Sequence, residues 1–112
     1  MSTITQPRLH HLAITVTDLD ASVRWYESVF DVHPVLDVPH LGGVGRILAG
    51  ADRQLMIALH RHDDNDGGLF TETATGLDHG GFAVPSRRDL ELWEDHLETN
   101  GVGRADTADK PL

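Results

Sequence analysis

Two histidines stand at matching places in a sequence that repeats itself, and they are the strongest candidates for chemistry. The chain has eight histidines among 112 residues and no cysteine, so imidazole and carboxylate groups are its available metal ligands. His11 and His79 are 68 residues apart. Two further pairs of identical residues keep this offset: Val16 with Val84, and Trp25 with Trp93. A matched pair of histidines in a repeat favours metal binding over two unrelated strand histidines, and we predict His11 and His79 as metal ligands.

The first copy of the repeat reads as a strand, a capped turn and a helix. Residues 9–16 alternate between an apolar face and a face that carries His11 beside small side chains, as a half-buried strand does. Residues 17–20 supply helix-capping side chains, and the helix is expected to end near Phe30. Its apolar positions form one stripe: Leu19, Val23, Tyr26, Val29 and Phe30. The first strand therefore has one face for a helix and one face for a ligand.

Three further strands are expected after this helix, at residues 32–38, 44–49 and 54–60, with residues 39–43 as a turn. Pro34 interrupts the first of them, which indicates an edge strand or a bulge. His60 shares a face of the last strand with Ala58, one pleat away. We predict His60 as a catalytic base or a substitute ligand, with an ordinary surface histidine as the alternative. The other histidines, His40 and His62 among them, show no pattern that assigns them to a site, and His10 should face away from His11.

The second copy begins with a predicted strand at residues 77–84, where His79 again lies beside small side chains. A helix follows from about Ser86 and ends at Asn100 and Gly101. Strands equivalent to the last ones of the first module would fall beyond Leu112. We therefore predict one α+β domain over residues 1–112, with a βαβββ module at 9–62 and a partial second module at 69–112.

Composition excludes some classes of partner. Nine basic residues against 18 acidic ones give a formal net charge of −9, which disfavours nucleic acid. No stretch approaches the roughly 20 apolar residues of a membrane span, and the N-terminus has no apolar run typical of a signal peptide. The expected setting is the cytoplasm, and the expected partner is a small molecule.

The opening segment resembles the vicinal oxygen chelate superfamily, which includes glyoxalase I, bleomycin resistance proteins, fosfomycin resistance proteins and extradiol dioxygenases. The resemblance rests on a histidine, an alternating strand, an Asp-Leu turn and a Ser-x-x-aromatic-Tyr helix: His11, Val16, Asp18, Leu19, Ser22, Trp25 and Tyr26. His79 in the segment GLDHGGFAV matches the second motif, a histidine that opens a strand after the linker. The resemblance implies two βαβββ modules, each curled into half a barrel around a shared cleft.

The resemblance also implies which positions hold a metal. His11 and His79 match the two first-strand ligands, while the fourth-strand position of the first module falls at about Ala58, which cannot coordinate. The remaining ligand in such families is a Glu, and its position lies past Leu112. Two histidines and one carboxylate resemble the sites of fosfomycin-modifying transferases and extradiol dioxygenases.

The resemblance thus implies a metal-dependent small-molecule enzyme, acting through a divalent Fe, Mn, Ni or Zn ion as a Lewis acid on a bidentate oxygen substrate. A homodimer is expected, because these proteins build clefts by pairing modules within or between chains. The alternative is a metal-free protein of the bleomycin resistance type that sequesters a drug. The acidic charge would suit a cationic drug, whereas the two retained histidines favour the metalloenzyme.

Overall fold

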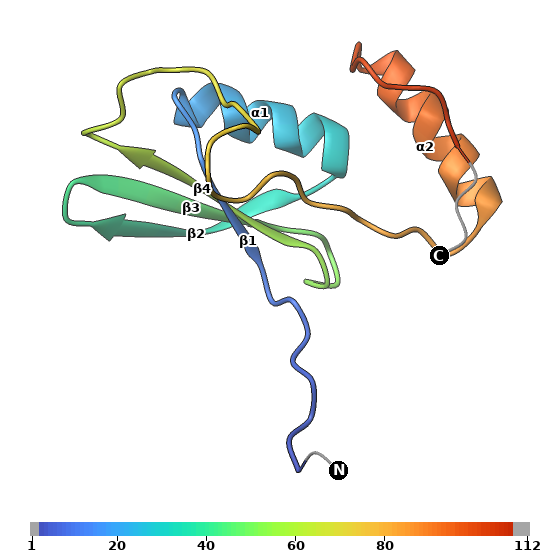
Figure 1. Ribbon diagram of the computed structural model, residues 1–112, viewed down its shortest axis with the longest axis horizontal. Helices are drawn as coiled ribbons and strands as arrows, with labels where there is room; N and C mark the ends of the chain where they lie inside the picture. Colours follow the sequence, from blue (N-terminus) through green and yellow to red (C-terminus); the bar gives the residue numbers. More distant parts are fainter. Residues whose placement is uncertain (1–2, 109–112) are drawn as a thin grey trace. The chain divides into compact units, whose positions relative to one another are not determined.

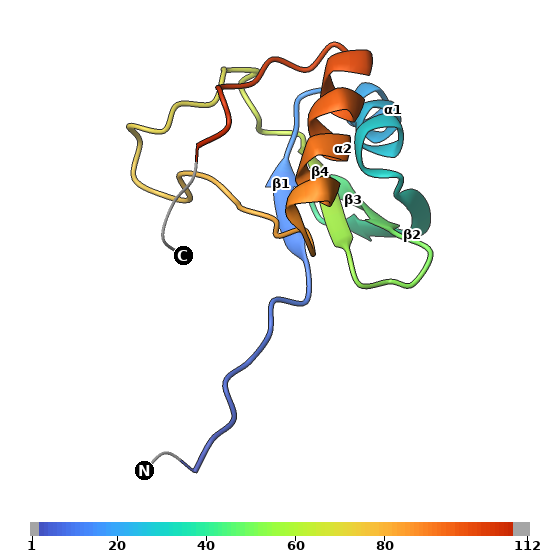
Figure 2. The ribbon, with the colours of Figure 1, turned by 90° about the vertical axis from the view of Figure 1, so that its right-hand side faces the viewer.

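The structure, a computed structural model, describes residues 3–108, and these divide into two compact units at the junction of Leu69 and Phe70. Figures 1 and 2 show the elements along the chain. In order they are β1 (Leu12–Thr15), α1 (Leu19–Phe30), β2 (His33–His40), β3 (Gly43–Ala49), β4 (Met56–His62) and α2 (Arg87–Thr99). The first five elements belong to the first unit and confirm the βαβββ module and the α+β class.

The four strands of the first unit form one sheet in the order β1-β4-β3-β2. Strands β2, β3 and β4 are joined by antiparallel pairing, while β1 and β4 run parallel because α1 and the meander lie between them in the chain. β2 is an edge strand, and its register with β3 shifts between Pro34 and Leu36. Both structural readings of Pro34, edge and bulge, are therefore confirmed.

Helix α1 covers one face of this sheet (Figure 1). Asp18 begins the helix as its N-cap, and its side chain accepts a hydrogen bond from the backbone N–H of Ala21 at 3.1 Å. The predicted apolar stripe packs on the sheet, with the buried core made by Leu19, Val23, Val32, Leu48, Ile57 and Leu59. Burying each such side chain contributes about 1.5–3 kcal/mol. Since strand side chains alternate, this packing turns the intervening residues of β4, including His60, to the face away from α1.

The second unit contains α2, whose start repeats that of α1. Its N-cap is Ser86, whose hydroxyl accepts from the N–H of Asp89 at 3.2 Å and which lies 68 residues after Asp18. The helix is followed by Gly101 in the left-handed region, at φ 69°, as the predicted Asn100-Gly101 ending requires. The offset of the two histidines thus also relates the two helix N-caps.

The strand predicted at residues 77–84 is wrong. Within the described residues 70–108, α2 is the only regular element, and residues 77–83 are all exposed. An alternating pattern gives a strand two distinct faces, but its backbone groups also need a neighbouring strand to bond with.

Neither α1 nor α2 is long and apolar enough to cross a membrane.

Candidate functional site

His11 directly precedes β1 and is exposed. Its Nδ1 lies 2.9 Å from Nδ1 of His10, and the two rings meet edge to face with centroids 5.2 Å apart. The prediction that His10 faces away from His11 is therefore wrong. Strand β1 begins only at Leu12, so strand pairing does not set the directions of the His10 and His11 side chains.

His79 belongs to the second unit and has an 83% exposed side chain. Its Nδ1 lies 2.6 Å from Oδ1 of Asp78, and because a carboxylate only accepts, Nδ1 carries the proton. In the neutral ring Nε2 has the lone pair, which is the arrangement of metal-binding histidines whose other nitrogen donates to a carboxylate. His11 and His79 lie in different units, so their joint ligation of one metal stays a prediction.

Three further histidines come together within the first unit. His40 ends β2, and His60 and His62 occupy alternate positions on β4, so they share a face of the sheet. One ligand nitrogen from each lies within 4.8 Å of the others. Nδ1 of His60 is 3.3 Å from Nε2 of His40, and the rings of His60 and His62 stack at 13°. We call these three residues the histidine cluster.

Two glycines of β3 make room for the histidine cluster. Gly43 pairs with His40 on one side and His62 on the other, and Gly45 pairs with His60. A Cβ at Gly45 would lie 2.8 Å from Nδ1 and 2.9 Å from Nε2 of His60, closer than side-chain carbons approach. One at Gly43 would lie 2.8 Å from Cε1 of His40. The imidazoles therefore lie over the bare backbone of β3.

The backbone also orients His40. Its Nδ1 lies 3.2 Å from the carbonyl oxygen of Leu41, which can only accept, so Nδ1 donates. Nε2 of His40 then carries the lone pair that faces Nδ1 of His60. Burial lowers the pKa of His60 below its ordinary value, and the charges of His40, His62 and, last, His11 lower it further. His60 is thus held as a neutral imidazole within electrostatic reach of His11.

Sequence reasoning missed His40 and His62 as members of a site. The spacing of His60 and His62 by two was a usable signal, because it places both on one face of a strand. Their meeting with His40 depends on the pairing register across β3, with Gly43 between His40 and His62. That register follows from turn lengths and the bulge near Pro34 rather than from any local pattern.

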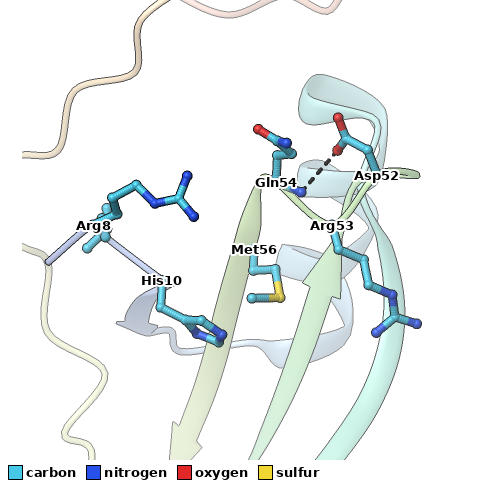
Figure 3. A pocket seen from close by; sticks show the side chains of 7 residues that line it. Arg8, His10, Asp52, Arg53, Gln54 and Met56 are labelled. Carbon is cyan, nitrogen blue, oxygen red and sulfur yellow. Dashed lines mark hydrogen bonds between the residues drawn. The ribbon is translucent and has the colours of Figure 1, made fainter.

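A pocket of about 850 Å³ opens at one end of the sheet (Figure 3). Arg8, His10 and Arg53 give it three basic side chains, while Asp52 accepts a hydrogen bond from the backbone N–H of Gln54 at 3.0 Å. The residues that line it include neither His11 nor the histidine cluster. The pocket is therefore distinct from both groups of candidate ligands.

A protein-family model matches nearly the whole chain. Residues 8–110 match the Glyoxalase/Bleomycin resistance protein/Dioxygenase superfamily. The chain belongs to this superfamily. A search of curated proteins gave no match.

Solved structures of the superfamily share the fold of the chain. A glyoxylase/bleomycin resistance protein/dioxygenase domain from Frankia sp. EAN1pec is 32% identical, with a TM-score of 0.83 over 96% of this chain and 78% of that one. The fosfomycin resistance protein FosX from Listeria monocytogenes is 16% identical, with a TM-score of 0.66 over 95% and 75% of the two chains. A FosX variant in complex with Mn(II) and 1S,2S-dihydroxypropylphosphonic acid is 14% identical, with a TM-score of 0.64 over 96% and 79%. The two FosX structures, at these identities, share the fold alone.

The ligand position that the superfamily resemblance assigns to β4 lies at Ala58. Ala58 is 3% exposed and pairs with Ala13 of β1, on the face that also carries His60. A methyl group has no lone pair, so the first module offers His11 and no second donor at this position. This position of β4 therefore provides neither a carboxylate nor an amide ligand.

The pKa of His60 gives a test of the environment of the histidine cluster. In chelator-treated, metal-free protein, the His60 imidazole is expected to titrate below its ordinary value of 6.5. The unfolded chain then binds this proton more tightly, so the contribution of His60 to stability falls as the pH drops below 6.5 and is recovered above it. Proton–nitrogen NMR of the imidazoles measures the midpoint, with His60→Gln to assign the signal. A midpoint at or above 6.5 would contradict the burial of this ring.

Proposed function

We propose that this chain is a metal-dependent small-molecule enzyme of the superfamily, in which His11 and His79 bind one divalent Fe, Mn, Ni or Zn ion. The observation that carries the proposal is the 68-residue offset, which relates the two histidines and also the N-caps of the two helices. Two equivalent modules are expected to present equivalent positions to one cleft. A bound ion would act as a Lewis acid on a substrate that offers two oxygens.

The residues around the two histidines suit this role. Asp78 holds the protonated Nδ1 of His79 and leaves Nε2 as the metal-binding nitrogen. The residue two positions after each proposed ligand has a small side chain or none: Ala13 after His11, and Gly81 after His79. Small neighbours leave space for a substrate beside the ion. The FosX variant, with its Mn(II) and a diol-bearing phosphonic acid, supports this substrate chemistry for the fold.

The proposed site needs a further ligand besides two imidazoles. A carboxylate would complete a 2-His-1-carboxylate set and leave open positions for a bidentate substrate. We propose that the chain forms a homodimer and that its own contribution to this set is the pair of imidazoles. Their loss can be measured directly.

The test is the metal content of the purified protein and of two single variants. His11→Ala and His79→Ala should each lose the same one equivalent of metal per chain, and the double variant should lose no more, because both side chains serve one ion. His96→Ala, on α2, is the matched control and should keep all of the metal. Unchanged metal content in both variants would contradict the proposal. A metal-free wild type that binds a cationic drug stoichiometrically would favour drug sequestration instead.

A further inference from the structure

We propose that His40, His60 and His62 form a second metal site, which binds a divalent transition-metal ion within the first unit. This site shares no residue with the pair His11 and His79 and needs nothing from the second unit. It lies on the sheet face away from α1, where three side chains from β2 and β4 converge over β3. The proposal goes beyond the proposed function, and either can hold without the other.

The spacing of the imidazole nitrogens suits a shared ion. Two nitrogens that each bind a tetrahedral zinc ion at about 2.0–2.1 Å stand about 3.3–3.4 Å apart. Nδ1 of His60 and Nε2 of His40 are already 3.3 Å apart. One nitrogen of His62 lies within 4.8 Å of a ring nitrogen of each of the other two histidines, and His62 is exposed, so a rotation of its side chain can bring it closer. The three donors are therefore nearly placed before an ion binds.

The protonation pattern also suits ligation. A metal needs a lone pair from each imidazole, and the Leu41 carbonyl fixes the proton of His40 on Nδ1, so Nε2 is the free donor. His60 is half-buried among other imidazoles, which disfavours a proton on its ring. In the absence of a metal, Nδ1 of His60 donates to Nε2 of His40, and ligation through Nδ1 requires this proton to move to Nε2 of His60 by exchange with solvent.

The donor atoms of the histidine cluster indicate which metal ions it would bind. Three nitrogen donors favour Zn, Ni, Co or Cu over Mg or Ca, which prefer oxygen. The exposure of His62 leaves the outer side of the site to water as a fourth ligand.

Cobalt(II) is the probe, because its visible absorption reports tetrahedral nitrogen coordination. The titration is done on the full chain in the His79→Ala background, which removes the proposed first site. His40→Ala and His62→Ala should each weaken cobalt binding by about tenfold or more and lose the tetrahedral band, since even supporting residues of metal sites are worth about 10–100-fold. His33→Ala, at the other end of β2, is the control and should bind as the background does.

The outcomes separate the two proposals. A tetrahedral cobalt band that persists in His79→Ala and disappears when His62→Ala is added supports the second site. This result does not depend on whether His11 and His79 bind a metal. Equal cobalt affinity in the background, His40→Ala and His62→Ala proteins would overturn it, and so would the absence of a band from all of them. Far-ultraviolet circular dichroism checks that each variant is folded. If an alanine variant is unfolded, His62→Gln provides the same test with a side chain of similar size.

Discussion

Replacing Gly45 by alanine is expected to weaken metal binding at the histidine cluster by about 10–100-fold, the range found when a residue that supports a metal ligand is lost. The added Cβ would fall within 3 Å of both ring nitrogens of His60, so the ring must swing away from its place over β3. That movement separates Nδ1 of His60 from Nε2 of His40, the two nitrogens that are 3.3 Å apart. Cobalt(II) titration in the His79→Ala background measures the change.

Gly45 is suited to this experiment because its backbone tolerates a side chain. Its φ is outside the left-handed region, and the nearest atoms to the new methyl group belong to the flexible ring of His60. Gly103→Ala is the control, because a Cβ there meets nothing within 4 Å. Cobalt affinity that is the same in both variants would show that the position of the His60 ring does not matter for binding.

Replacing Leu59 by alanine is expected to lower the free energy of unfolding of the first unit by about 2–5 kcal/mol. Leu59 is 0% exposed and packs in the core with residues of α1 and β3. Its removal leaves a cavity beneath the strand that carries His60, its immediate neighbour in sequence. Urea denaturation of both proteins, followed by circular dichroism, measures the difference in unfolding free energy.

Leu41→Ala is the matched control for Leu59→Ala. It deletes the same atoms from a side chain that is 104% exposed, in the turn between β2 and β3, so the change should stay within about 0.5 kcal/mol. An equally small change for Leu59→Ala would contradict the packing of α1 on this sheet. The comparison also shows whether the histidine cluster depends on the core behind it.

The first unit could be predicted from sequence because its signals are local. The alternation before Val16, the stripe on α1 and the polar turns each depend on residues close together in the chain. Pro34 even indicated the edge position and the bulge of β2. The packing of Ile57 and Leu59 in the core, two residues apart on β4, follows from the same alternation.

The histidine cluster could not be predicted in this way, because it depends on register between strands. His40 and His62 are 22 residues apart and meet only because both pair with Gly43. The failed strand at residues 77–84 has a related cause, since its alternation resembles that of β1 but its pairing partner is not encoded in the segment itself. The repeat in the sequence singles out His79, but it does not predict which strand, if any, pairs with the segment around it.

The most direct measurement is anomalous diffraction, at the absorption edge of manganese or zinc, from crystals of the protein grown with that metal. The account predicts a peak within about 2.0–2.2 Å of ring nitrogens from both His11 and His79, contributed by one chain or by two copies. Crystals in which these two side chains open into separate cavities in every copy, with no peak beside either, would contradict it.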